Sequence, residues 1–284
     1  MKKTERNEPL MTDYMQWYKD KLISILNEIC ETQETAIDQA AQVVADTVLA
    51  GKNVYAFGPS HAGMMVEEMV YRGGGLAVIN PIHVPNLMPN VRPYAMTTQI
   101  ERLPGLATIT LERSGIKPGD CLIIHSVSAR IPIVIEMAMK AKEKGIHVIG
   151  IVSKDFASKV TSLDPSGTMM MEHCEIVIDD CAELGDACVP IEGLGYKAAP
   201  TSTVGGAYVV NSLVIKVAEK MLAAGVQPPI FKSGNVDGAN EYNAQLMEKY
   251  NGRIVQTGQA DSLFELIADC LITTHPRAAQ TNTL

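Results

Sequence analysis

Short apolar runs of strand length alternate with segments of helical spacing along most of the chain. Apolar runs predict strands at residues 53–58, 121–125, 146–153 and 174–180, and a shorter strand at 76–79. Apolar residues spaced three and four apart predict helices over 131–145 and 201–222. Strands that alternate with helices form parallel βαβ units, and their sheet is covered on both faces. The pattern therefore predicts an α/β domain around a parallel sheet.

Residues 12–50 have helical spacing almost throughout, with a break near residues 31–33 that predicts two helices. A helix is expected from Ser60 to about Arg72, a single helix over residues 100–114, and a glycine-rich connection over 182–195. Residues 80–99 contain four prolines and are expected to form a long loop. A capping box at Ser262 predicts one more helix near the C-terminus. We expect a helical segment at residues 1–50, a domain at 51–250, and a helix with a tail at 251–284.

Charge and cysteine usage narrow the functional classes. The chain has 284 residues, a formal net charge of −8 and no basic cluster, which argues against a nucleic-acid-binding surface. No apolar run approaches the length of about 18 residues that spans a membrane. The six cysteines form no C-x-x-C pair, so we expect free thiols, no metal site, no cofactor and a cytoplasmic location.

Several predicted strands and one predicted helix are bordered by polar residues. Ser60 and His61 follow the first strand, Ser126 and Ser128 follow the strand at 121–125, and Ser202 opens the helix at 201–222. Ligands of open α/β sheets bind beyond the carboxyl ends of the strands, and helix starts attract phosphate. The pattern favours a phosphate site there. The alternative is that these hydroxyls only cap helices, because serine and threonine are common at such positions for structural reasons.

The order of these motifs resembles the sugar isomerase (SIS) domain, and is most similar to uncharacterised bacterial SIS proteins that resemble phosphoheptose isomerases. The resemblance covers residues 12–254. It is carried by the segment 57–61, the Ser126-x-Ser128 pair, and the segments 67–82, 185–187, 200–203 and 235–238. It implies a three-layer αβα sandwich around a five-stranded parallel sheet of flavodoxin-like type, preceded by N-terminal helices. It also implies a homodimer or higher homo-oligomer that binds a phosphosugar.

The resemblance further implies that Ser126, Ser128, Ser202 and Thr203 hold the phosphate. The usual Ser-x-Ser-Gly-x-Thr loop is altered here, because Ala129 and Ile131 replace the glycine and the last hydroxyl. Arg130 can supply the lost contact through its planar guanidinium, or it is a solvated residue in the first turn of the helix.

Isomerisation needs a base that moves a proton between adjacent sugar carbons. The resemblance places the catalytic glutamate at Glu67 or Glu68. Glu68 is seven residues after His61 and four before Arg72, so the three share a helix face. Glu68 is the preferred base, with His61 nearby and Glu67 as the other candidate. The competing interpretation is a surface ion pair between Glu68 and Arg72.

The histidine that phosphoheptose isomerases carry on their long C-terminal helix is replaced here by Asn211, which can bind a sugar hydroxyl but cannot transfer protons as imidazole does. His125 and His173 are candidates to replace it, although histidines in or beside strands are often structural. The sequence therefore predicts a phosphosugar-binding protein, with sugar-phosphate isomerisation as the expected activity. The alternatives are a non-catalytic phosphosugar sensor and a sugar-phosphate lyase or deglycase.

Overall fold

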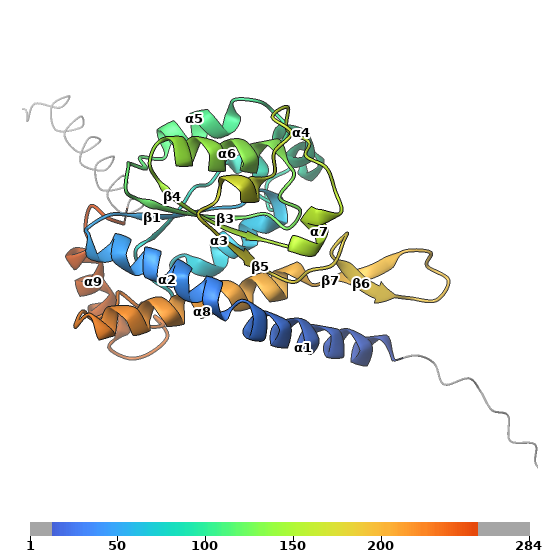
Figure 1. Cartoon of the computed structure of the whole chain (residues 1–284). Coiled ribbons are helices and arrows are strands. Elements are labelled where there is room, and N and C mark those ends of the chain that lie inside the picture. Colours follow the sequence, from blue (N-terminus) through green and yellow to red (C-terminus); the bar gives the residue numbers. More distant parts are fainter. Residues whose placement is uncertain (1–12, 255–284) are drawn as a thin grey trace, which may run out of the picture.

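The computed structural model describes residues 13–254, which fold around a five-stranded parallel sheet with helices on both faces (Figure 1). The strand order is β2-β1-β3-β4-β5, and every neighbouring pair is parallel. The strands are β1 (Val54–Phe57), β2 (Ile79–Pro81), β3 (Cys121–His125), β4 (His147–Val152) and β5 (Ile176–Asp179). The predicted fold class, an αβα sandwich with N-terminal helices, is confirmed.

Both faces of the sheet are buried because each central strand is apolar at nearly every position. Val54 and Ala56 of β1 belong to one hydrophobic cluster, whereas Tyr55 and Phe57 belong to the other. Successive side chains of a strand point to opposite faces, so one continuous apolar run supplies two cores.

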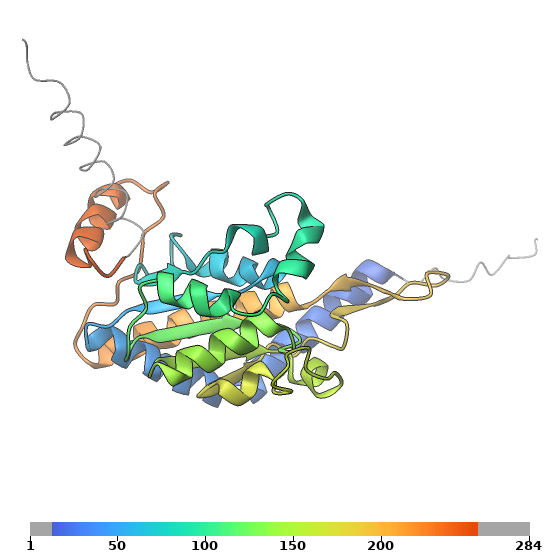
Figure 2. The ribbon, with the colours of Figure 1, turned by 90° about the horizontal axis from the view of Figure 1, so that it is seen from above.

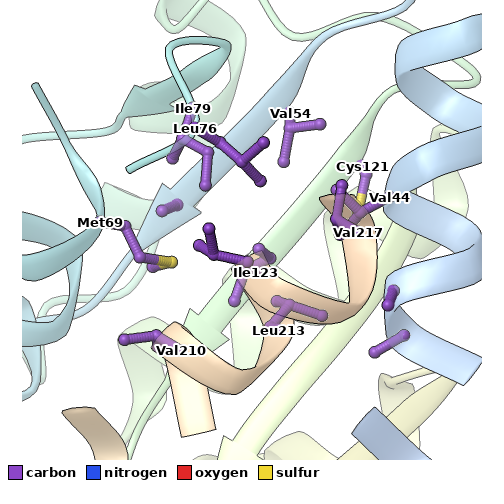
Figure 3. Close-up of a cluster of buried hydrophobic side chains, with 14 of the residues drawn as sticks. Val44, Val54, Met69, Leu76, Ile79, Cys121, Ile123, Val210, Leu213 and Val217 are labelled. Carbon is purple, nitrogen blue, oxygen red and sulfur yellow. The ribbon is translucent and has the colours of Figure 1, made fainter. Parts of the chain in front are cut away.

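The helices divide between these two cores. The first core packs β1 and β3 against α2 (Glu34–Leu49), α3 (Gly63–Met69) and α8 (Ser202–Ala223), as Figure 3 shows for Val44, Met69 and Val210. The second core lies under α5 (Leu106–Arg113) and α6 (Pro132–Glu143). The short α7 (Lys154–Ser158) follows β4, and α9 (Ala239–Lys249) lies at one end of the molecule (Figure 2).

The predicted break in the N-terminal helical segment is confirmed: α1 (Tyr14–Thr32) and α2 meet at Gln33. The Gln33 side chain is buried, and its Oε1 accepts a hydrogen bond of 3.0 Å from the N–H of Asp179. The Gln33 side chain at this break therefore joins the two N-terminal helices to the end of β5.

The α1 helix extends beyond the sheet beside a hairpin that the sequence pattern did not reveal (Figure 1). The hairpin consists of β6 (Ala187–Pro190), which lies within the expected glycine-rich connection, and β7 (Lys197–Pro200), which follows it; the two strands pair antiparallel. Tyr18 donates to the Pro200 carbonyl at 2.7 Å, and Lys21 lies 2.5 Å from Glu183. These contacts hold α1 against the hairpin and the start of α8.

Several predicted bounds differ from those observed. The helix after β1 ends at Met69 instead of Arg72, because Val70 is extended and Tyr71 has a φ of 46°. The helix expected over 100–114 is divided into α4 (Thr97–Ile100) and α5, since proline at position 104 interrupts it. The α9 helix was not expected, and the helix predicted at Ser262 lies outside the described residues. No helix within residues 13–254 is long and apolar enough to cross a membrane.

Candidate functional site

The strand order reverses between β1 and β3, because the chain passes from β1 outward to β2 and then back across β1 to β3. Phe57 and Ile124 are direct neighbours in the sheet, so the segments that follow β1 and β3 leave the same edge side by side. Such a reversal leaves a crevice beyond the carboxyl ends of the strands. Ser60 and His61 follow the end of β1 and Ser126 follows the end of β3, so all three leave the sheet at this edge.

The turn after β1 is tight and carries Ser60 and His61. Ser60 has a φ of 55° and is half-buried, while His61 is exposed. A Cβ at Gly58 would lie 2.5 Å from the carbonyl oxygen of Ala62, so only glycine permits this approach of the turn to the strand end. The turn thus holds a hydroxyl and an imidazole at the mouth of the crevice.

Residues 126–130, which we call the serine loop, follow β3. Their carbonyl groups face the protein: those of Ser126, Val127, Ala129 and Arg130 accept bonds from Ala129, Ser153, Met170 and Leu163. The N–H groups of Val127, Ser128 and Arg130 donate to no other residue within 13–254. Ala129 is buried with a φ of 55°. Unpaired N–H groups on either side of a left-handed residue form the kind of concave backbone that binds anions.

Arg130 adds a cation to the serine loop. Its Nε atom is buried and has no hydrogen-bond partner among the described residues. Its guanidinium is in no ion pair within that part of the chain. A buried donor without a partner is costly, so this position suits an anionic ligand.

The helix α6 that follows contributes little of its own to anion binding. Pro132 occupies its first turn and has no N–H group. The next N–H, that of Ile133, donates to the carbonyl of Glu101 at 3.1 Å. The donors available at this edge are therefore those of the loop rather than those of the helix.

His125 is buried beneath the crevice. Its Nδ1 lies 3.2 Å from the carbonyl oxygen of Ala62, and its Nε2 lies 3.3 Å from Oδ2 of the fully buried Asp180. Gly206 of α8 packs against the imidazole, and a Cβ there would lie 3.6 Å from Cε1. His125 thus links the turn after β1 to the end of β5. His173, the other histidine proposed as a replacement, lies 2.8 Å from the hydroxyl of Thr168.

The start of α8 already contains a carboxylate. Asp186 Oδ1 accepts bonds from the N–H groups of Thr201 at 2.9 Å and Ser202 at 2.8 Å. Its Oδ2 accepts the Ser202 hydroxyl at 2.6 Å. The structure therefore brings Ser202 to Asp186, while Thr203 is half-buried one residue further along. The positive end of the α8 dipole is neutralised by this side chain.

Glu68, Arg72 and Asn211 meet where α3 packs beside α8. Glu68 Oε1 accepts a short bond from the Arg72 guanidinium and a bond of 2.9 Å from the amide of Asn211. Asn211 is nine residues into α8, about 13 Å from its start at the standard helical rise. The Glu68–Arg72 ion pair, which was the competing interpretation of the sequence, is thus present. Glu68 and Asn211 therefore lie some way along α3 and α8 from the edge of the sheet at which the serine loop lies.

Glu67 points elsewhere. Its Oε1 lies 3.2 Å from Nε2 of His83, and both residues line a cavity of about 80 Å³ beside the loop at residues 88–90. The side chains of the adjacent Glu67 and Glu68 therefore lie on different faces of α3. Within residues 13–254 no group of three or more His, Cys, Asp or Glu side chains is arranged to hold a metal ion.

Comparison with known proteins gives a consistent assignment. Residues 17–153 match the family model of the SIS domain. A UPF0309 protein of Oceanobacillus iheyensis is 44% identical over 85% of this chain and 98% of that protein. A UPF0309 protein of Shouchella clausii is 40% identical over the same shares. The chain belongs to the UPF0309 family. The SIS resemblance expected from the sequence is confirmed by the family model.

Solved structures similar to this UPF0309 chain have low sequence identity. A phosphoheptose isomerase from Francisella tularensis is 14% identical with a TM-score of 0.47, and the match covers 73% of this chain and 97% of that one. The sugar isomerase domain of an RpiR transcription factor from Sphaerobacter thermophilus is 15% identical with a TM-score of 0.42, and covers 81% and 93%.

Two residues of the UPF0309 site were missed by reasoning from sequence. Asp186 was part of the segment that carried the resemblance, but nothing in its local pattern indicated that it caps a helix starting 16 residues later. His83 lies in the proline-rich loop, where no periodicity indicates that it faces Glu67. Both contacts join segments that are separated in sequence, so only the folded chain reveals them.

Proposed function

We propose that this UPF0309 protein binds a sugar phosphate, with the phosphate on the serine loop, and interconverts its aldose and ketose forms. The observation that carries the proposal is the serine loop itself. Four of its five carbonyl groups accept hydrogen bonds from the protein, the N–H groups of Val127, Ser128 and Arg130 are left without partners among the described residues, and the buried Nε of Arg130 is unpaired. These are the donors that a phosphate dianion requires.

The turn after β1 supports the same assignment. Ser60 and His61 lie beside the serine loop, because β1 and β3 are neighbouring strands. A phosphate held by the loop directs the sugar toward this turn and the exposed face of α3. The hydroxyl of Ser60 then binds a sugar oxygen.

Glu68 is the proposed base. Both of its hydrogen bonds within the described residues end on Oε1, which leaves Oε2 to act on substrate. The carboxylate removes the proton from the carbon next to the carbonyl and returns it to the former carbonyl carbon through an enediol. His61 moves the proton between the two sugar oxygens, and Asn211 orients the sugar hydroxyls.

One observation favours a second candidate, a phosphosugar-binding protein without catalysis. Glu68 is engaged by Arg72 and Asn211, and Asn211 replaces the histidine that the SIS resemblance leads one to expect. Binding and turnover must therefore be measured separately.

Binding is tested by calorimetric titration with hexose, heptose and amino-sugar phosphates and with the same sugars lacking phosphate. Arg130→Gln should weaken binding of the phosphorylated sugars at least tenfold and leave the others unchanged, because it removes a charge-assisted contact. Arg102→Gln, a change at an exposed arginine, is the matched control. Equal affinities for Arg130→Gln and the control would show that the phosphate does not bind to the serine loop.

Turnover is tested with the sugar phosphates that bind. Glu68→Gln should reduce kcat at least 100-fold while Kd changes less than threefold, since the amide still accepts hydrogen bonds but cannot take a proton. Glu67→Gln should retain most activity. Loss of activity in Glu67→Gln alone would transfer the role to the Glu67–His83 pair. Tight binding without turnover in the unchanged protein would favour the second candidate.

A further inference from the structure

A second cavity of about 330 Å³ lies between the turn after α3 and the segment that leads into α9. Two backbone segments frame it, because the N–H of Gly74 donates to the Phe231 carbonyl at 2.8 Å and the N–H of Phe231 donates to Gly75 at 3.0 Å. Since α3 begins at the carboxyl end of β1 and runs back along the sheet, this cavity lies away from the serine loop. It is formed by the parts of the chain around residues 73–75 and 235–238, which carried the resemblance but received no role.

The cavity is lined by two cations and by no aspartate or glutamate. One cation is Arg72, whose guanidinium is already paired with the Glu68 carboxylate. The other is Lys232, whose Nζ lies 4.3 Å from the centre of the Tyr242 ring. Asn243 fixes the backbone of Lys232, because its side chain accepts from the N–H at 3.0 Å and donates to the carbonyl at 2.8 Å. The ammonium group of Lys232 is therefore held in place by contacts that do not neutralise its charge.

Tyr71 forms an aromatic wall of this cavity. It has a φ of 46° although it is neither glycine nor asparagine, and it is 72% exposed. Its ring meets that of Phe231 edge to face at 5.3 Å. A bulky residue held in a left-handed conformation is strained. The strain and the exposure of the ring point to a role in binding.

We propose that this cavity is a binding site for a phosphate monoester that carries a sugar or nucleoside ring. Lys232 binds the phosphate, the face of Tyr71 stacks on the ring, and the exposed amide of Asn240 binds the ring's polar groups. The site is separate from the serine loop, and the ion pair between Arg72 and Glu68 joins it to the reaction proposed there.

The test uses the full chain with Arg130→Gln, so that binding at the serine loop does not obscure this site. Inorganic phosphate, glucose 6-phosphate and AMP are titrated by calorimetry. At least one of the two ring-bearing probes should bind more tightly than phosphate, and the better of them identifies the sugar or nucleoside source. Adding Lys232→Gln should weaken that binding at least tenfold.

Lys249→Gln is the matched control, because Lys249 also lies over a tyrosine ring, at 5.4 Å, but is outside the cavity. It should change Kd less than twofold. Tyr71→Gly should weaken only the ring-bearing probes, because glycine accepts the φ of 46° and leaves the backbone of the cavity in place.

The proposal is overturned if the Arg130→Gln protein binds none of the three probes, or if Lys232→Gln behaves like Lys249→Gln. If Arg130→Gln binds sugar phosphates as the unchanged protein does and Lys232→Gln abolishes that binding, the present site stands and the serine-loop proposal fails.

Discussion

The serine loop and the start of α8 have similar sequences of hydroxyl residues, yet their environments are opposite. In the loop, the N–H groups of Val127, Ser128 and Arg130 and the Nε of Arg130 have no partner among the described residues. At α8, Asp186 accepts from two N–H groups and from the Ser202 hydroxyl. The same donor chemistry is therefore open to a ligand in one region and satisfied internally in the other. Hydroxyl residues at a strand end or helix start indicate an anion site only when no carboxylate of the chain has already taken it.

Removing the internal carboxylate is the strongest way to test this comparison. Asp186→Ala should lower the free energy of unfolding by about 2 kcal/mol, because two backbone donors and a hydroxyl lose a charged acceptor. Urea denaturation measures the change. Asp155→Ala, which removes a surface ion pair with Lys159 in the first turn of α7, should cost less than about 1 kcal/mol. Equal costs would mean that Asp186 is not what satisfies the start of α8.

The serines of the two regions should respond in opposite ways. Ser202→Ala should lower the free energy of unfolding by about 1 kcal/mol and leave sugar-phosphate binding within twofold, because its hydroxyl donates to Asp186 at 2.6 Å. Ser128→Ala should weaken binding roughly fivefold with no loss of stability, because a net hydrogen bond to the ligand is worth about 1 kcal/mol. Calorimetric titration measures the ligand affinity of both variants, and urea denaturation measures their free energy of unfolding. A ligand that depends on Ser202 would place the phosphate at α8 after all.

The smallest expected effect is on the pH dependence of stability, and it comes from Asp179 at the end of β5. Burial raises the pKa of this carboxyl, and bonds from the N–H groups of Cys181 and Lys154 oppose the rise only in part. With the folded pKa above the unfolded one, the folded state binds more protons just above the ordinary pKa of aspartate. The contribution of this group to stability should therefore fall as pH rises through that range.

Asp179→Asn keeps the acceptor oxygen and removes the charge. The variant should lose this dependence and differ from the unchanged protein by about 0.5 kcal/mol or less at neutral pH, as urea denaturation between pH 4 and 7 would show. A steeper loss of stability in the variant as pH rises would contradict the assigned direction.

Much of the fold is encoded locally. The strands at β1, β3, β4 and β5 follow from continuous apolar runs, since a parallel sheet covered on both faces requires apolar residues at successive positions. The break at Gln33 and the start of α8 at Ser202 also appear in the pattern. Elements without a strong period were missed or misplaced: the β6–β7 hairpin, α9 and the bounds of β2. Their stability comes from packing on distant segments such as α1.

The candidate site likewise has features that the local sequence encodes and features that depend on tertiary contacts. The sequence by itself determined which polar residues lie at the carboxyl edge, because strand ends in a parallel sheet share one side. It also offered the pairing of Glu68 with Arg72 as the competing interpretation, and the pair forms although the helix ends before Arg72. Only the tertiary structure decided which donors remain open. Asp186 reaches the start of α8 through the hairpin, Asn211 reaches Glu68 across two helices, and the buried Nε of Arg130 has no partner among the described residues. Hydrogen-bond satisfaction depends on contacts between segments far apart in the chain, and no local pattern of residue types encodes those contacts.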